Sequence, residues 1–345
     1  MHIALIVPAP FDTVSGGYEY DRRVVAGLRA AGHTVDVLEL PGSFPLTDTR
    51  AVAAAHAAWA GLAAETYVVI DGLALPAFAA LGEAIAARPR VVGLIHHATS
   101  LETGLAETDR FNLGGIERHL FRSVGRVIAN SETTADSLHG EFGVSRERIA
   151  IVTPGTDPAP RSVGSGPHGC HLLTVGTLIP RKGHDVLLRA LARLFDLDWR
   201  LTIAGSPAAD PVHASGLAAL AEELKITQRV TFAGETTGPE LQALWHSADV
   251  FALATHYEGY GMVVAEALKR GLPVAVTAGG AASALVPIDG SVVCQPGDSD
   301  GLSKAMRRLI YSADLRRDMA QVAWEAGAAL PSWATQSQLF AESLG

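Results

Sequence analysis

Short apolar runs alternate along the chain with longer stretches in which apolar residues recur at helical spacing. The first half contains six runs typical of buried strands: HIALIVP, TVDVLEL, TYVVIDG, RVVGLIHH, GRVIANS and RIAIVTPG. Helical stretches lie between them, at about 18–31, at about 48–64 and at PAFAALGEAIAA. Strands that alternate with helices in this way predict a parallel sheet with helices on both faces.

The alternation stops between Thr156 and Cys170 and then starts again. The segment TDPAPRSVGSGPHGC is crowded with proline, glycine and serine, so we place a linker at about 157–169. The second half then shows strand-like runs at HLLTVGTL, WRLTIAGS, VTFAGE, DVFALAT, PVAVTAG and SVVCQ. Helices are expected from about His184, around 212–225, near 238–247 and from about Met262. The second half thus repeats the architecture of the first, and doubly wound domains of this kind bind ligands at the carboxyl ends of their strands.

Composition agrees with two folded domains. A length of 345 residues fits two domains, and 48% apolar residues are enough for a large core. Charged residues make up 18% and aromatic residues 6%, as expected for a globular protein. The net charge of −9 makes general nucleic-acid binding a poor hypothesis, because phosphate neutralisation needs a basic surface.

The chain shows no sign of export or of membrane insertion. Its two cysteines, Cys170 and Cys294, are far apart and fit neither a disulfide framework nor a metal motif. The start, MHIALIVPAPF, lacks a basic leader and reads as a first strand. No run approaches about 18 apolar residues, so no transmembrane helix is expected. We therefore expect a soluble cytoplasmic protein.

The stretch HYEGYGMVVAEALKRG places two glutamates, Glu258 and Glu266, around a glycine turn and a helix start. A turn of this kind at the carboxyl end of a parallel strand exposes backbone N–H groups, and the helix adds a partial positive charge. Such a place suits a phosphate or a polar sugar, whose hydroxyls the carboxylates could bind. The alternative is structural: Glu258 caps the helix and Glu266 is a solvated helix residue.

Two cations, Arg181 and Lys182, follow a strand and precede Gly183 and a helix. The helix dipole disfavours cations at this end, so a bound anion would resolve the conflict. Cations fixed here would stabilise a diphosphate leaving group as it gains charge. The alternative is a pair of exposed cations without a ligand.

Two further candidates follow strands of the first half. Gly16 and Gly17 permit close backbone approach to a phosphate, although they do not form a GxGxxG fingerprint. His96 and His97 end the run RVVGLIHH, where either one could serve a ligand or simply be structural. A metal site is disfavoured there, since neighbouring strand residues point to opposite faces.

Several stretches together resemble the retaining glycosyltransferases of family 4, which use nucleotide sugars. The most specific is DVFALATHYEGYGMVVAEALKRGLPVAVTAGG, with glutamates in an E-x7-E pattern. VGTLIPRKGHDVLLRAL is similar to the family's phosphate-binding loop and helix, and SGGYEYDRRVVAGLRAAGH to its glycine loop and first helix. RVIANSETTADSL and RIAIVTPGTD resemble the stretches before its linker. The resemblance covers nearly the whole chain.

The resemblance implies the GT-B architecture, an α/β fold of two facing Rossmann-like domains with parallel sheets and a deep cleft between them. It places an acceptor-side domain at 1–157 and a nucleotide-sugar-binding domain at 158–331. It also implies that the last helix, at about 332–345, packs back on the first domain.

The resemblance assigns roles to the candidate residues. Glu258 would bind the donor sugar and Glu266 the ribose, while Lys182 and Arg181 would meet the diphosphate. Backbone contacts to the sugar or phosphates would come from the two glycine turns: Gly16, Gly17, Gly259, Tyr260, Gly261 and Met262.

Two positions need comment. The family often has a histidine at this strand end, near the donor sugar and acceptor; the register favours His96, and the adjacent pair leaves the choice between His96 and His97 open. Thr177 stands where the family commonly has an arginine, and Arg181 is the candidate to supply the missing guanidinium to the donor.

The function implied is transfer of a sugar, with retention, from a UDP- or GDP-linked donor to an acceptor hydroxyl. Front-face substitution is expected, in which the departing diphosphate helps to deprotonate the acceptor. No metal or other cofactor is expected, because Lys182 and the helix dipoles take the metal's place. The D-x-D patterns at Asp196–Asp198 and Asp298–Asp300 lie outside the site, and the second fits a helix cap.

Alternatives on the same fold are a nucleotide-sugar epimerase, a sugar phosphorylase and a non-catalytic sugar-nucleotide binding protein. Peripheral membrane contact would follow if the acceptor were a lipid, but the first helix lacks the strongly basic amphipathic character that would support it. The acceptor and the oligomeric state are left open by the sequence.

Overall fold

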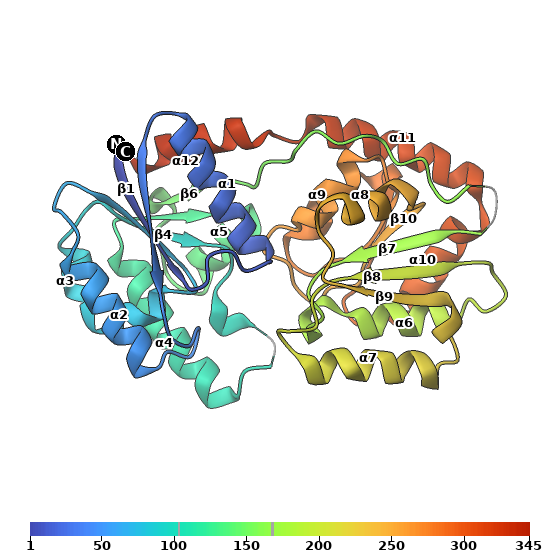
Figure 1. The fold of residues 1–345 in the computed structure, drawn as a ribbon, viewed down its shortest axis with the longest axis horizontal. Helices are drawn as coiled ribbons and strands as arrows, with labels where there is room; N and C mark the ends of the chain where they lie inside the picture. The colour runs from blue at the N-terminus through green and yellow to red at the C-terminus, as the bar shows by residue number, and fades with distance from the viewer. Residues whose placement is uncertain (103, 167–168) are drawn as a thin grey trace. The chain divides into compact units, whose positions relative to one another are not determined.

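The alternation of strands and helices builds two units, each around its own parallel sheet. The computed structural model describes residues 1–102, 104–166 and 169–345. Unit 1 comprises Met1–Gly155 and Pro331–Gly345, and unit 2 comprises Thr156–Leu330 (Figure 1). The chain thus returns to unit 1 at its end.

Unit 1 is built on a six-stranded parallel sheet of order β2-β1-β3-β4-β5-β6. Its strands are β1 (His2–Pro8), β2 (Thr34–Leu40), β3 (Tyr67–Asp71), β4 (Val91–Ile95), β5 (Arg126–Ala129) and β6 (Ile149–Ile151). Alternate strand residues face opposite layers. Ile6 and Ile70 join one core cluster. Leu5 and Val69 face the other side, toward Val24 and Val25.

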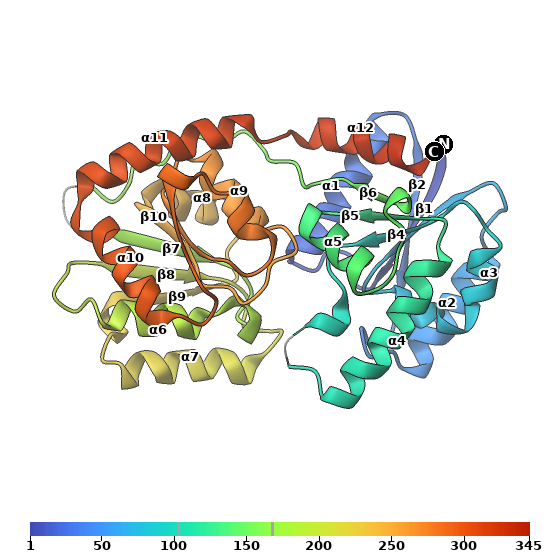
Figure 2. The ribbon, with the colours of Figure 1, turned by 180° about the vertical axis from the view of Figure 1, so that it is seen from behind.

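Helices cover both faces of this sheet. They are α1 (Gly16–Ala30), α2 (Thr49–Ala60), α3 (Gly82–Ala86), α4 (Glu107–Ser123), α5 (Glu132–Gly140) and α12 (Trp333–Leu344). Short 3-10 turns are η1 (Leu75–Leu81), η2 (Thr99–Leu101) and η3 (Arg146–Arg148). The C-terminal helix α12 packs along α1, and Figure 2 shows the same pair from behind. The segment PAFAALGEAIAA is helical but not a single α-helix, because the 3-10 turn η1 forms its first half and α3 its second.

Unit 2 repeats the plan with the order β12-β11-β10-β7-β8-β9, again all parallel. Its strands are β7 (His171–Val175), β8 (Arg200–Ala204), β9 (Val230–Gly234), β10 (Val250–Leu253), β11 (Val274–Thr277) and β12 (Ser291–Cys294). Its α-helices are α6 (His184–Ala192), α7 (Pro211–Glu223), α8 (Gly238–Ser247), α9 (Met262–Lys269), α10 (Ser299–Tyr311) and α11 (Ala313–Ala329). Its 3-10 turns are η4 (Pro180–Lys182), η5 (Thr227–Arg229), η6 (Ala281–Ala284) and η7 (Ile288–Gly290). Both figures show α6 and α7 on one side of the sheet and α8 and α9 on the other.

The expected linker at 157–169 lies along unit 2, with residues 167–168 outside the described residues. Ser162 N–H donates to the carbonyl of Arg270, and Val163 N–H donates to the carbonyl of His246. These bonds fix the segment to the unit that it enters.

Each sheet reverses its order at one place, and that place positions the candidate site. In unit 1 the reversal lies between β1 and β3, and in unit 2 between β7 and β10. Crevices at such points, at the carboxyl ends of the strands, are where open parallel sheets bind ligands. No helix within the described part of the chain is long and apolar enough to cross a bilayer.

The return of the chain to unit 1 can be tested at Gly155. A Cβ atom there would lie 2.4 Å from the backbone nitrogen of Trp333, so Gly155→Ala must displace the start of α12. We expect the free energy of unfolding to fall by about 1–3 kcal/mol in urea denaturation. Gly140→Ala is the control, since nothing lies within 4 Å of its added Cβ. Equal stability of the two variants would contradict the tight packing of Trp333 on Gly155.

Candidate functional site

In unit 2 the loops after β7 and β10 are held together by their backbones. Gly183 has φ 62°, and a Cβ there would lie 2.0 Å from the carbonyl oxygen of Ala254, so only glycine allows this approach. The carbonyl of Arg181 accepts hydrogen bonds from His256 N–H at 2.7 Å and from Thr255 Oγ1 at 3.0 Å. The two candidate loops are therefore joined by backbone contacts at the point where the sheet reverses.

Glu258 is held at this surface by two cations. Its Oε1 accepts from Lys182 Nζ at 2.6 Å and from Arg181 Nη1 at 3.3 Å, and it lies 3.2 Å from Thr255 Oγ1. Burial would raise the pKa of this carboxyl group, but Lys182 and Arg181 lower it, with a net lowering. Among the described residues no hydrogen bond reaches the other carboxylate oxygen, Oε2. Glu258 is thus ionised, anchored through one oxygen and able to accept a ligand hydroxyl through the other.

The structural alternative for Glu258 is wrong. The N-cap of α9 is Gly261, which has φ 99° and no side chain to cap with. The turn Gly259–Tyr260–Gly261 leads into α9 at Met262, as the sequence predicts. Glu266 lies inside α9 and is partly exposed.

Thr177 lies in the loop after β7, partly buried, and its carbonyl accepts a hydrogen bond from Ile179 N–H at 2.9 Å. Arg181 Nη1 also donates to the carbonyl of Tyr257 at 2.7 Å. The guanidinium of Arg181 is therefore oriented by the Glu258 loop. Whether it replaces an arginine at position 177 toward a donor stays a prediction.

His184 belongs to the surroundings of this site and was missed by sequence reasoning. It is the first residue of α6, is 1% exposed, and has no hydrogen-bond partner on either ring nitrogen among the described residues. Burial, and then the charge of Lys182, lower its pKa to about 3, so the ring is neutral. The only sequence signal was a histidine directly after Lys182-Gly183.

In unit 1 the glycine loop and one histidine meet. Ser15 caps α1 by accepting from Tyr18 N–H at 3.4 Å, and Gly16 and Gly17 open the helix. A Cβ on Gly17 would lie 3.3 Å from Cδ2 of His96. It is therefore the His96 ring that lies against the glycine loop, whereas His97 Nε2 is 2.8 Å from Oε1 of Glu102.

His96 lies between two buried carboxylates that the sequence did not reveal. Its Nε2 is 3.1 Å from Oδ1 of Asp21, on α1, and 3.4 Å from Oδ2 of Asp71, at the end of β3. Burial alone would lower the pKa of His96, but Asp21 and then Asp71 raise it to about 10. Burial raises the pKa of Asp21 to about 6 against the lowering effect of His96. A pKa raised in this way favours the protonated imidazolium at neutral pH.

One side-chain oxygen or nitrogen from each of Asp21, Asp71 and His96 lies within 4.8 Å of the other two, close enough to share a metal ion as well as a proton. That no metal is needed stays a prediction. The two D-x-D patterns serve structure: Asp196 binds Arg307 at 2.7 and 2.9 Å, and Asp298 caps α10 by accepting from Gly301 N–H at 2.8 Å.

Comparison with known sequences identifies the class of protein. Residues 164–325 match the model described as "Glycosyl transferases group 1", and residues 15–160 match "Glycosyltransferase Family 4". D-inositol 3-phosphate glycosyltransferase from Mycobacterium sp. (strain KMS) is 34% identical over 175 residues, which are 48% of this chain and 39% of that protein. The enzyme of the same name from Actinosynnema mirum is 30% identical over 256 residues, which are 66% of this chain and 61% of that protein. The chain thus matches less than two thirds of either relative.

Comparison of structures gives the fold. Sucrose-phosphate synthase from Thermosynechococcus elongatus aligns with a TM-score of 0.81 at 19% identity, over 99% of this chain and 98% of that one. Anabaena HepE in complex with UDP-glucose aligns with a TM-score of 0.78 at 19% identity, over 99% of each chain. The two sheets and their helices therefore define a GT-B protein. With both family models matched in succession, the chain belongs to glycosyltransferase family 4.

The Lys182–Glu258 pair should matter for stability as well as for ligands. Lys182→Ala leaves the buried Glu258 with Arg181 as its remaining cation, so we expect a loss of about 2 kcal/mol in the free energy of unfolding. Urea denaturation at pH 7 measures it. Lys304→Ala removes a lysine from an exposed pair with Asp300 and should leave stability unchanged. If the free energy of unfolding of both variants equals that of the wild type, the Lys182–Glu258 pair does not stabilise the fold.

The His96 cluster predicts a pH dependence of stability. The folded-state pKa of His96 is raised to about 10. Its stabilising contribution should therefore be complete below about pH 6.5 and disappear as the pH rises through about 10. The stability difference between wild type and His96→Asn should shrink over that window by at most about 1.4 kcal/mol per pH unit. A difference that stays constant from pH 6 to pH 10 would contradict an imidazolium at position 96.

Proposed function

We propose that the protein transfers a sugar from a nucleoside-diphosphate sugar to an acceptor hydroxyl, with retention of configuration and without a metal. The observation that carries the proposal is Glu258, ionised and anchored at Oε1 by Lys182 and Arg181, with Oε2 able to accept a sugar hydroxyl. This arrangement stands at the reversal point of unit 2, beside the N-terminus of α9.

The same surface suits a diphosphate. Lys182 and Arg181 supply two fixed cations where the leaving group gains negative charge, and the turn at Gly259–Gly261 brings the start of α9 to it. In the proposed step the bond from C1 of the sugar to the phosphate oxygen breaks, and its electron pair leaves with the diphosphate. The acceptor oxygen bonds to C1 on the same face, and its proton passes to the departing phosphate oxygen.

The comparisons support one donor to test first. HepE, a structural neighbour, is described in complex with UDP and with UDP-glucose, and the sequence relatives are named D-inositol 3-phosphate glycosyltransferases. We propose a UDP-linked sugar as donor, with Glu266 on the ribose. D-inositol 3-phosphate is the first acceptor to try.

Donor binding tests the site. Calorimetry of the whole chain with UDP, GDP, ADP and TDP and their sugars, in EDTA, should show preference for one nucleotide. Lys182→Ala should weaken that binding about tenfold to a hundredfold, because a charge-assisted contact to phosphate is lost. Glu258→Gln should bind the free nucleotide normally but turn over about 100-fold more slowly. Lys304→Ala is the control for both measurements.

Turnover separates the alternatives. A glycoside product should form only when an acceptor alcohol is present. Proton NMR of that product should show the same anomeric configuration as the donor sugar. Product without an acceptor alcohol would favour the epimerase, and product only with added phosphate would favour the phosphorylase. Tight binding without any product would favour a binding protein. No binding of any nucleotide would overturn the assignment of the donor site.

A further inference from the structure

The ring of His96 is fixed on several sides by different elements of unit 1. Asp21 comes from α1 and Asp71 from β3, and both side chains reach Nε2. The ring of Tyr20 stands edge-on to it at 5.1 Å, and Gly17 closes a further side. Asp71 is itself oriented, because its Oδ1 accepts from Leu73 N–H at 2.8 Å. One ring nitrogen is therefore occupied by the protein in a defined geometry.

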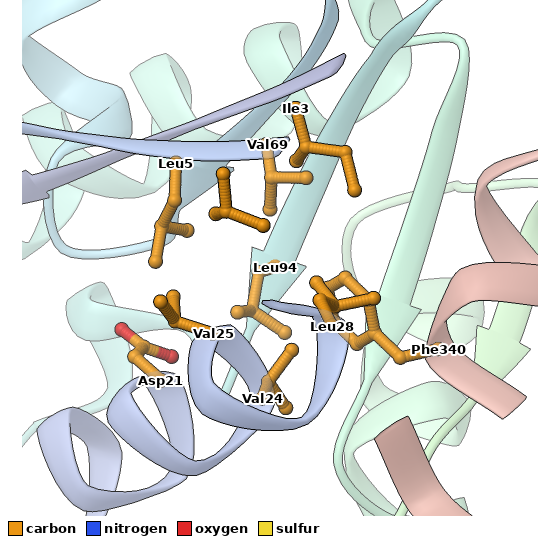
Figure 3. A pocket seen from close by; sticks show the side chains of 10 residues that line it. Ile3, Leu5, Asp21, Val24, Val25, Leu28, Val69, Leu94 and Phe340 are labelled. Carbon is orange, nitrogen blue, oxygen red and sulfur yellow. The ribbon is translucent and has the colours of Figure 1, made fainter. Parts of the chain in front are cut away.

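The two carboxylates need a cation, since Asp21 is 1% exposed and Asp71 is 5% exposed. Figure 3 shows Asp21 at the edge of a small cavity otherwise lined by apolar side chains, so water does not solvate it there. Arg22 is the other cation that acts on Asp21, but its guanidinium donates to Glu19 and to two backbone carbonyls. His96 is left to supply the charge.

Within the described part of the chain, the other titratable groups around the His96 ring have partners elsewhere. Tyr18 donates its hydroxyl to the carbonyl of Pro8, and Tyr20 donates its hydroxyl to the carbonyl of Val152. His97, next in the chain, has its Nε2 beside Glu102. Glu39 acts on Tyr18 rather than on His96.

We propose that Asp21 and Asp71 are positioning residues, which hold Nε2 of His96 so that the ring meets its ligand as a hydrogen-bond donor through Nδ1. The ligand atom is then an oxygen acceptor, such as a sugar hydroxyl or a phosphate oxygen. Nδ1 has no partner among the described residues, and the side chain is 16% exposed. What Nδ1 meets rests on the proposed function, but the state of the ring does not.

The assignment excludes a role for His96 as a general base. An imidazolium with both nitrogens protonated cannot accept the acceptor's proton. A base would have to lose the Nδ1 proton first, which the two carboxylates oppose. This agrees with a reaction in which the leaving diphosphate takes that proton.

The state of the ring is tested without any substrate. Long-range proton–nitrogen NMR on the whole chain, with EDTA, should show both His96 nitrogens protonated from pH 6 to pH 9. In Asp21→Asn and in Asp71→Asn the ring should become neutral at lower pH than in wild type. The control is Asp36→Asn, which removes the carboxylate of the exposed His2–Asp36 pair and should leave the His96 signals unchanged. A neutral ring at pH 7, or signals that change on adding Zn²⁺ or Mg²⁺, would overturn the proposal.

The nitrogen that faces the ligand is tested by two replacements. The amide of asparagine stands near the position of Nδ1 and that of glutamine near Nε2. His96→Asn should therefore retain more turnover than His96→Gln, measured with the donor and acceptor found for the wild type. Equal loss, or the reverse order, would overturn the assignment of Nδ1.

The carboxylates should act on turnover through His96. Asp21→Asn should lower kcat by up to about a hundredfold with little change in donor affinity. Its rate should also acquire a decline toward alkaline pH that the wild type lacks below pH 9. A loss without a changed pH profile would indicate a merely structural role. If no donor or acceptor is turned over by the wild type, the proposed function fails while the NMR result still decides the state of His96.

Discussion

The buried pair of Lys182 and Glu258 is the interaction on which the candidate site depends. A carboxylate in this position must be compensated, and the 2.6 Å contact to Nζ does so through a single oxygen. That contact requires the loops after β7 and β10 to touch, which explains the left-handed glycine at 183 and the backbone bonds from Thr255 and His256 to Arg181. The charge of Glu258 is therefore compensated only when the loops after β7 and β10 are in contact.

The same logic recurs in unit 1 with the charges reversed. There a cationic ring is held by two carboxylates at one nitrogen, where Glu258 is held by two cations at one oxygen. In each arrangement one polar atom, Oε1 of Glu258 or Nε2 of His96, is bound by the protein. The second polar atom of the same side chain can then bind a ligand. A side chain fixed in this way loses little conformational entropy when a ligand arrives.

The sequence predicted the parts of this molecule that depend on local pattern. Periodicity located both parallel sheets, and the glycine turns located the loops around Lys182 and Glu258. It did not locate Asp21 or Asp71, because these residues lie 75 and 25 positions before His96 and meet it only through the strand order. Helix α4 was missed since Gly114 and Gly115 interrupt its apolar pattern. The roles of Glu266, Thr177 and His97 stay predictions, because no contact in the structure decides them.

Gly183 has a consequence for how such a protein can diversify. Any side chain at this position overlaps the carbonyl of Ala254, so the contact between the two loops excludes every residue but glycine there. Under the proposed function, changes in donor preference would instead arise at neighbours such as Thr177 and Tyr257, which are only partly buried. The surface therefore combines one position fixed by steric contact with neighbouring positions that are partly exposed. Substitution at those neighbours would alter the surface without rebuilding the loops that hold the charge.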